Sequence, residues 1–255
     1  MAIGIVDVFI VLLIILGGVV GFNNGFIREG IHFIGTIVIT VVAFMFKDIL
    51  MVFFYQNLPF FNFYGGLRNI TSINILLYQL LAFIVIFATL FFLLRVLLVI
   101  TGLIELLIKL TVFLKMSSKI LGIVVGVFEY YIYIFVVLFI LNMPIFNLSF
   151  VADSNLGQKM LSNTPVLSSY IEDTVYTYAD VWNIIRTRKK KTDIEVNTLV
   201  LATLLDHKLV TIDNAKTLVE ANKILITDEE LLDKYEDDND FYKYVKKQIA
   251  KNKKS

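Results

Sequence analysis

The sequence contains no cysteine, only two histidines and three prolines among its 255 residues. The lack of cysteine excludes disulfides, thiol nucleophiles and cysteine-bound metals. Because zinc sites are built mainly from cysteine and histidine, the single pair His32 and His207 does not predict one. The sequence also lacks a phosphate-binding glycine loop and a nucleophile elbow. We therefore expect no enzyme activity, no cofactor and no metal.

Charge is scarce in the first 143 residues, which carry seven Lys/Arg and five Asp/Glu. Residues 186–255 carry fifteen Lys/Arg and thirteen Asp/Glu. The small net charge of +1 therefore conceals an apolar N-terminal part and a polar C-terminal part. Nucleic-acid-binding proteins usually show a basic excess, and this chain does not, so we expect no nucleic-acid partner.

Four long runs are almost free of charge: 8–27, 30–46, 69–94 and 120–152, the last interrupted by Glu129. A helix needs about 20 apolar residues to cross the hydrocarbon layer, and only helices or closed barrels satisfy their backbone there. The sequence therefore predicts an all-α, multi-pass membrane protein with four transmembrane helices, near 6–22, 27–46, 73–100 and 119–143. Lacking a basic region before it, the first run is not a signal peptide and remains the first helix.

The segments between and after these helices predict three domains: a transmembrane domain at 1–145, a membrane-proximal helix and basic linker at 146–191, and a polar helical extension at 192–255. The aromatic connector at 49–72 and an amphipathic segment at 101–117 are expected at the membrane interface. A re-entrant loop lining a pore is the alternative for the connector. In the extension, 209–211 and 225–227 form a weak repeat, and Thr227 with Glu230 predicts a helix cap. The small extension is expected to need a protein partner.

Glycines recur at intervals of four in two predicted helices, a spacing that lets helix backbones approach closely in lipid. The candidate packing residues are Gly17, Gly21, Gly25, Gly30, Gly122 and Gly126. Packing within the bundle is the favoured interpretation, and self-association is the alternative.

Three ionisable residues are expected at membrane depth, away from the ends of their predicted spans or close to one turn inside them: His32, Arg95 and Glu129. Charge at this depth is costly, so it marks a candidate site. Arg95 and Glu129 are expected at similar depth and are predicted to pair across the bundle. The pair is either structural or part of a proton or solute pathway.

Basic residues gather after the last predicted span, at Arg186, Arg188, Lys189, Lys190 and Lys191. They would contact anionic lipid headgroups if cytoplasmic and would form a charged linker if outside. Four spans place both termini on one side. Basic residues near helix ends favour the cytoplasmic side. The loops opposite the termini carry four basic residues and the termini's side carries three, which favours termini outside the cell. Counting the basic cluster at 186–191 would reverse this result.

Asp7 and the later run Gly21-Phe22-Asn23-Asn24-Gly25-Phe26-Ile27-Arg28-Glu29 resemble the opening of the bacterial colicin V production protein family. The family motif maps to Asp7, Arg28 and Glu29, and a second glycine motif follows at 119–126. The resemblance covers about 5–180. This sequence departs from the family at Asn23-Asn24, Ser118-Lys119 and Glu129-Tyr130, which puts a shared basic surface in doubt.

The resemblance implies a protein of the bacterial cytoplasmic (inner) membrane. We expect a non-enzymatic scaffold or helper in the cell envelope, linked to toxin production or export. The alternative is an oligomeric channel or small transporter. Ion or solute flux that is abolished by Glu129→Gln would favour the transporter, and partner capture without flux would favour the scaffold.

Overall fold

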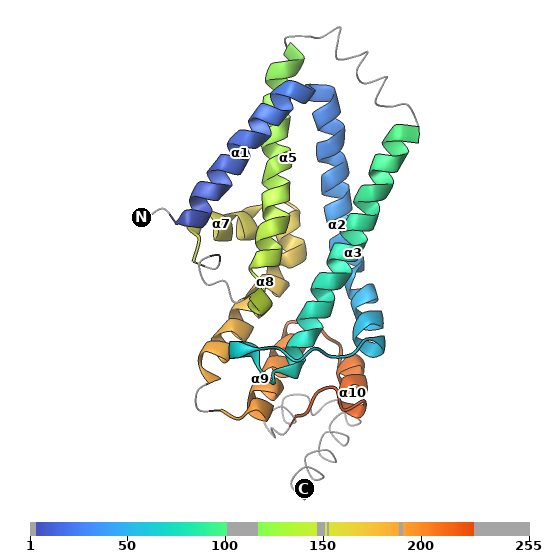
Figure 1. Ribbon diagram of the computed structural model, residues 1–255, viewed down its shortest axis with the longest axis vertical. Helices are drawn as coiled ribbons and strands as arrows, with labels where there is room; N and C mark the ends of the chain where they lie inside the picture. Colours follow the sequence, from blue (N-terminus) through green and yellow to red (C-terminus); the bar gives the residue numbers. More distant parts are fainter. Residues whose placement is uncertain (1–3, 101–116, 147–150, 152, 189–190, 227–255) are drawn as a thin grey trace, which may run out of the picture. The chain divides into compact units, whose positions relative to one another are not determined.

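The computed structural model describes residues 4–100, 117–146, 151, 153–188 and 191–226. Within these ranges the chain forms α-helices and short 3-10 turns, and no strand (Figure 1). Four helices are long and apolar enough to cross a membrane: α1 (Ile5–Asn24), α2 (Phe26–Asn57), α3 (Asn74–Ile100) and α5 (Ser117–Leu141). The predicted all-α fold with four transmembrane helices is confirmed.

The second span extends further than the sequence pattern predicts. The sequence predicts that the second span ends near Phe46, because the charged residues Lys47 and Asp48 follow. That boundary is wrong, since α2 continues to Asn57. Lys47 and Asp48 lie inside the helix, with Lys47 Nζ donating to Asp48 Oδ1 at 2.9 Å. Met51 and Tyr55, four residues apart on one face, are buried and support the extra turns. At 1.5 Å per residue the 32-residue helix is about 48 Å long, well beyond a hydrocarbon layer of roughly 30 Å.

After the last span, the part of the chain that the structure describes contains four further helices. They are α7 (Asn155–Asn163), α8 (Leu167–Arg186), α9 (Asp193–Asp206) and α10 (Ile212–Glu220). The connector after α2 is extended except for two 3-10 turns at Gly65–Leu67 and Thr71–Ile73. Residues 101–116 of the predicted amphipathic segment, and the predicted cap at Thr227 and Glu230, lie outside the described residues.

The packing divides the chain into two units that are each discontinuous in sequence. Unit 1 comprises Met1–Phe46, Phe83–Asn142 and Leu148–Ile171, and unit 2 comprises Lys47–Ala82, Met143–Asn147 and Glu172–Ser255. In unit 1 the buried Phe44 ring stacks on Phe83 at 4.7 Å and meets Phe139 edge-on at 4.9 Å. In unit 2 the rings of Phe60 and Phe61 lie 6.0 and 6.3 Å from that of buried Tyr78. The predicted division at 145 and 191, which follows composition along the sequence, stays a prediction.

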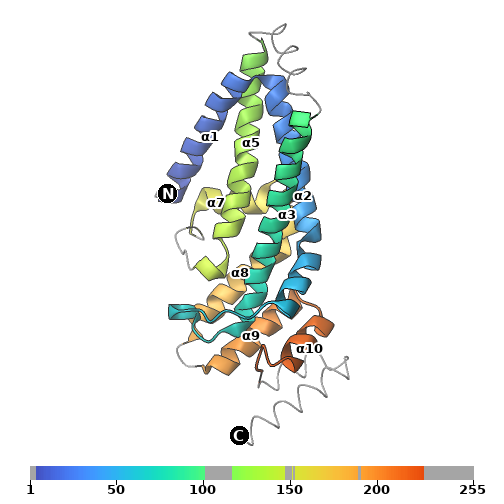
Figure 2. The same ribbon diagram turned by 45° about the vertical axis from the view of Figure 1, so that its right-hand side comes forward.

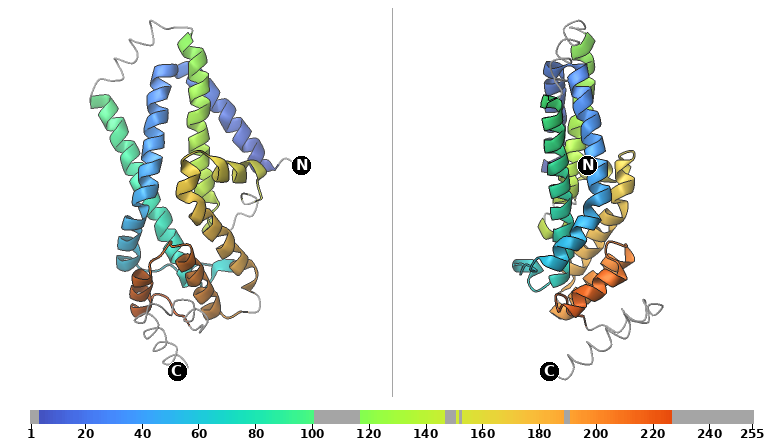
Figure 3. Two further views of the ribbon diagram at one scale, coloured as in Figure 1. Left: turned by 180° about the vertical axis from the view of Figure 1, so that it is seen from behind. Right: turned by 90° about the vertical axis from the view of Figure 1, so that its right-hand side faces the viewer.

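Within unit 1, α1 packs against α5 near the C-terminal end of α1, and the two helices diverge toward the N-terminal end of α1 (Figures 1 and 2). The short helix α7 packs against both of them, as the rear view in Figure 3 shows in yellow. This arrangement makes the α1–α5 contact the principal helix pair of the unit.

Contacts inside each unit agree with four membrane crossings. In unit 1, Asp7 at the start of α1 accepts a hydrogen bond from Ser154, which follows α5. In unit 2, Ser72 ahead of α3 bonds Asn197 in α9. Four spans lie between Asp7 and Ser154 in the sequence, and two spans lie between Ser72 and Asn197. Because successive spans cross the bilayer in opposite directions, an even number of spans returns the chain to the same side. Both members of each pair therefore lie on one side of the bilayer.

The ends of α9 and α10 form the same turn 14 residues apart, and the predicted 16-residue repeat stays a prediction because Thr227 lies outside the described residues. Lys208 (φ 56°) and Asn222 (φ 54°) both adopt the left-handed conformation. The next amide in each case, Leu209 N or Lys223 N, donates to a carbonyl five residues earlier at 2.9 Å. The two helices therefore end in the same type of cap.

Candidate functional site

Helices α1 and α5 approach one another at the backbone in the glycine seam, formed by Gly17, Gly21 and Gly25 with Gly122 and Gly126. A Cβ added at Gly17 would lie 2.6 Å from the Gly126 carbonyl oxygen, and one added at Gly21 would overlap the Gly122 carbonyl. Because the obstructing atoms are backbone, no side-chain rotation could relieve the overlap. The seam joins α1 to α5 inside one chain. Gly30 is different, since a Cβ there would meet nothing within 4 Å.

Gly25 also shapes the turn that starts the second span. Its φ of 79° separates α1 from α2, a backbone conformation that side-chain-bearing residues rarely adopt. Its amide donates to Gly21 O at 2.9 Å, and Phe26 N donates to Ser118 Oγ at 3.1 Å. The turn therefore presents Glu29, one helical turn later, to α5.

Two buried carboxyl groups meet in unit 1. Glu29 of α2 is 1% exposed and Glu129 of α5 is 5% exposed, and the two carboxyl groups act on one another electrostatically. Asn24 Nδ2 donates to Glu29 Oε2 at 2.9 Å, and Tyr133 Oη donates to Glu129 Oε1 at 2.5 Å. Thr36 Oγ1 extends the chain to Tyr133 Oη at 3.4 Å. These five side chains, the carboxyl cluster, join α1, α2 and α5.

The predicted Arg95–Glu129 pair does not form. Arg95 is exposed and its guanidinium lies 5.1 Å from the Phe91 ring centroid, and the described residues contain no ion pair between it and Glu129. The sequence placed Arg95 and Glu129 at similar depth, but depth alone does not set the direction in which a helix presents a side chain. Glu29 faces Glu129 instead. His32, half-buried one turn after Glu29, lies in the electrostatic field of Arg28, Glu29 and Arg95.

Sequence reasoning selected Glu29 only as a family-motif residue and did not select Asn24 or Tyr133 for the cluster. One signal was present for Tyr133. It follows Glu129 by four residues, so both side chains lie on the same face of a helix. No comparable signal in the sequence connects Asn24 and Glu29 to Glu129, because their contact depends on how α2 packs against α5.

The family-motif residue Asp7 joins the start of α1 to α7. Its Oδ1 accepts from Ser154 Oγ at 2.5 Å and from Leu156 N at 3.2 Å. Ser154 is itself the N-cap of α7, accepting from Gly157 N at 2.9 Å. A carboxylate at a helix start satisfies free backbone donors and complements the positive end of the helix dipole. Asp7 therefore fixes α7 beside the first span.

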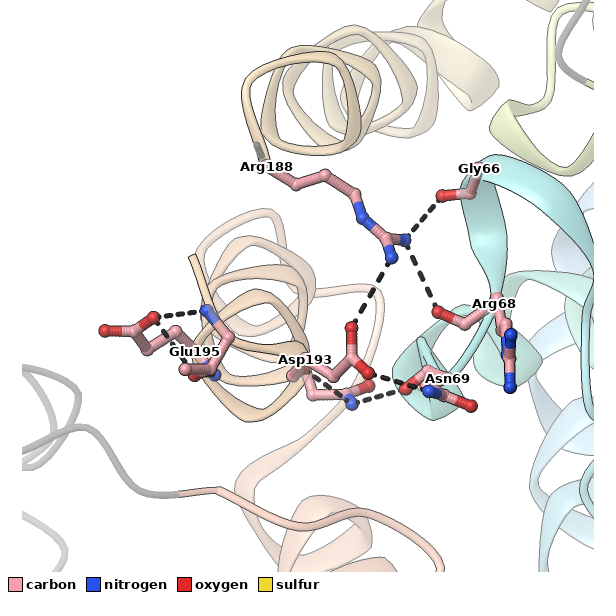
Figure 4. Close-up of polar contacts among 8 residues, drawn as sticks. Gly66, Arg68, Asn69, Arg188, Asp193 and Glu195 are labelled. Atoms are coloured by element: carbon pink, nitrogen blue, oxygen red, sulfur yellow. Dashed lines mark hydrogen bonds and ion pairs between the residues drawn. The ribbon is translucent and has the colours of Figure 1, made fainter. Parts of the chain in front are cut away.

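Two of the five basic residues after the last span have partners within unit 2. Arg188 Nη1 donates to Gly66 O at 2.6 Å and to Arg68 O at 3.3 Å, and its Nη2 lies 3.4 Å from Asp193 Oδ1 (Figure 4). The Arg186 guanidinium lies 4.8 Å from the Trp182 ring centroid. Lys191 is exposed, while Lys189 and Lys190 lie outside the described residues. Arg188 thus holds the connector, and the predicted lipid contact stays a prediction.

Asn197 connects the connector to α9. Its Oδ1 accepts from Ser72 N at 2.9 Å, and its Nδ2 donates to Asn69 O at 2.9 Å. Ser72 Oγ donates to the Asn197 carbonyl at 2.8 Å. Asn69 Nδ2 reaches Asp193 Oδ2 at 2.7 Å (Figure 4). Ser72 and Asn197 are both buried, so this amide satisfies polar groups that water does not reach.

The α9 start and the α2 end are also capped in unit 2. Thr192 N donates to Glu195 Oε2 at 2.6 Å, and this bond lowers the pKa of Glu195. Lys223 Nζ donates to the carbonyls of Tyr55 and Gln56 at 2.6 and 2.8 Å, at the C-terminal end of α2. Burial lowers the pKa of the Lys223 ammonium.

Beside these caps lies a pocket of about 270 Å³. It is lined by Asn62, Asn69, Thr71, Asp193, Ile194, Asn197, Asn222, Lys223 and Leu225.

The described residues contain no group of three or more His, Asp or Glu side chains placed to hold a metal ion. His207 bonds Asp180 through Nε2 at 3.0 Å on the surface of unit 2.

Comparison with known proteins gives one result. The model of the family described as "Colicin V production protein" matches residues 6–165. No curated protein and no solved structure matches the chain. The matched region contains all four spans, Asp7, the glycine seam and the carboxyl cluster, and it confirms the resemblance seen in the sequence. The chain belongs to the colicin V production protein family.

Proposed function

We propose that this protein is a non-enzymatic scaffold of the bacterial cytoplasmic membrane that holds a protein partner needed for toxin production or export. Family membership and the four spans support the setting. The observation that carries the proposal is the platform, by which we mean the connector at 58–73 together with residues 191–226. Buried hydrogen bonds such as Ser72–Asn197 hold the platform together.

A scaffold needs a surface whose shape does not depend on its partner. In the platform the polar groups of Asn197 and Lys223 are bonded to backbone, as is Arg188 just before it. In the membrane part, the backbone contacts of the glycine seam leave little freedom for α1 to move against α5. Such elements position a binding surface more firmly than loops do.

Site-specific photo-crosslinking in cells tests the proposal. A crosslinker placed at exposed Asp213 or Glu220 of α10 should capture the same protein partner from both positions. The matched control is exposed Phe92 on α3, which should yield lipid adducts only. Asn197→Leu should reduce capture at α10 while leaving the membrane level of the protein unchanged. Lipid adducts alone at all three positions would refute the proposal.

The second candidate is an oligomeric channel or small transporter, and the carboxyl cluster favours it. Ionisable groups inside a membrane commonly mark ion or proton pathways. Reconstituted vesicles should then show proton or solute flux that Glu129→Gln abolishes. Flux equal to that of empty vesicles would reject this candidate. Self-association through the glycine faces, the alternative to packing within the bundle, also stays a prediction.

A further inference from the structure

The carboxyl cluster holds two buried acidic groups, and the described residues place no positively charged partner against them. Glu29 and Glu129 are almost fully buried, and the described residues provide neither carboxyl with an ion-pair partner. Two ionised carboxylates in contact repel one another, and burying an unpaired charge is strongly unfavourable. The pair therefore needs a bound positive species to be stable.

The hydrogen bonds around the pair indicate which species this is. Asn24 presents its amide N–H group to Glu29, and Tyr133 presents its O–H to Glu129. Each carboxyl thus has one neutral donor on its outer side. The two buried carboxyl groups face one another, and a hydrogen bond between them requires a proton on one of them. We propose that Glu29 and Glu129 form a proton-binding site that holds one exchangeable proton between their carboxyl groups.

A metal cation fits the cluster less well. Hard cations such as calcium take six to eight oxygen ligands. Here Asn24 and Tyr133 direct N–H and O–H groups, not lone pairs, toward the carboxyl oxygens. That arrangement suits a shared proton, since it needs only the two carboxyl oxygens that face one another.

Three other charged or titratable groups act near the site. Arg28 and His32 belong to α2, and Arg95 belongs to α3. Tyr133 is the titratable neighbour on α5, and α1 contributes the uncharged Asn24. Burial and the negative partner carboxyl favour retention of the proton. Proton occupancy would thereby influence the contact of α2 with α5, because loss of the proton leaves two like charges in contact.

Infrared spectroscopy of the full-length protein in lipid nanodiscs tests the site directly. At neutral pH the wild type should show the carbonyl band of a protonated carboxyl, and the band should shift on transfer to deuterated water. Glu129→Gln and Glu29→Gln should each remove the band. The amide of either glutamine can donate to the remaining carboxylate, so the contact and the fold are preserved. Glu172→Gln, at an exposed position on α8, is the control and should keep the band.

The wild type alone keeps the test decisive even if the variants fold poorly. The band should move when the protein carries isotope-labelled glutamate and stay when only aspartate is labelled. Replacing sodium by choline at fixed pH should leave it unchanged. Absence of the band at neutral pH, its survival in both glutamine variants, or its dependence on sodium would each overturn the proposal. These measurements need neither a partner nor flux, so they stand apart from the tests of scaffold and transporter.

Discussion

The glycine seam permits a sharp test of what a single methyl group does between two membrane helices. Gly21→Ala places a Cβ against the Gly122 carbonyl, whereas Gly30→Ala adds the same atom where nothing lies within 4 Å. Alanine is favoured over glycine in a helix by about 1 kcal/mol, and this gain is common to both variants, so it cancels in their difference. Overpacking costs about 1–3 kcal/mol, and the upper end applies because the obstacle is backbone. Gly21→Ala should therefore be about 3 kcal/mol less stable than Gly30→Ala.

Reversible unfolding in mixed micelles, followed through the fluorescence of a dye placed on α1, measures this difference. Gly126→Ala, which contacts Gly17 O and Gly21 Cα, should behave like Gly21→Ala. Gly30→Ala should match or exceed the wild type in stability. Equal stability of Gly21→Ala and Gly30→Ala would refute the reasoning, since it would mean that α1 and α5 separate without cost.

Three further predictions concern polar contacts. Asp7→Asn should expose α7 to protease and lower the thermal midpoint, because its carboxylate no longer caps that helix; limited proteolysis measures this. Asn197→Leu should cost about 1–3 kcal/mol, since the buried amide of Ser72 loses its acceptor and the Asn69 carbonyl loses a donor; faster hydrogen exchange at 69–73 reports it. The pKa of Glu195 is lowered in the fold, so the unfolded chain binds more protons and this stabilisation is lost as pH falls below about 4.3. Glu195→Gln should remove that part of the pH dependence of hydrogen exchange at the start of α9.

The four spans could be predicted because lipid imposes one strong rule, a long apolar helix, and hydropathy reads it directly. The end of α2 could not, because Lys47 and Asp48 resemble a boundary in composition. Lys47 is nevertheless buried inside the helix, and exposed Asp48 is bonded by a distant residue, with Gln79 Nε2 donating to Asp48 Oδ1 at 3.4 Å. The sequence shows that a residue is charged, but not which neighbouring groups will form hydrogen bonds or ion pairs with it when it lies inside a helix.

The candidate sites divide in the same way. The spacing of Gly17, Gly21 and Gly126 indicated close packing, and the structure brings these residues together. Spacing along one helix fixes which residues share a face. The partner of Glu129 depends on how two helices turn toward each other, so the predicted Arg95 was wrong and Glu29 takes its place.

The contact between Ser72 and Asn197 constrains the order in which the protein can be made. The two residues are 125 positions apart, so at roughly 5–20 residues per second the connector waits about 6–25 s for its partner during synthesis. During that interval the third and fourth spans are inserted, and Ser72 lacks the side-chain amide of Asn197 as its hydrogen-bond partner. A chain that stops at residue 191 would have all four spans and an incomplete connector. The polar C-terminal segment is thus a late folding element of the membrane protein, and its removal would alter the part made first.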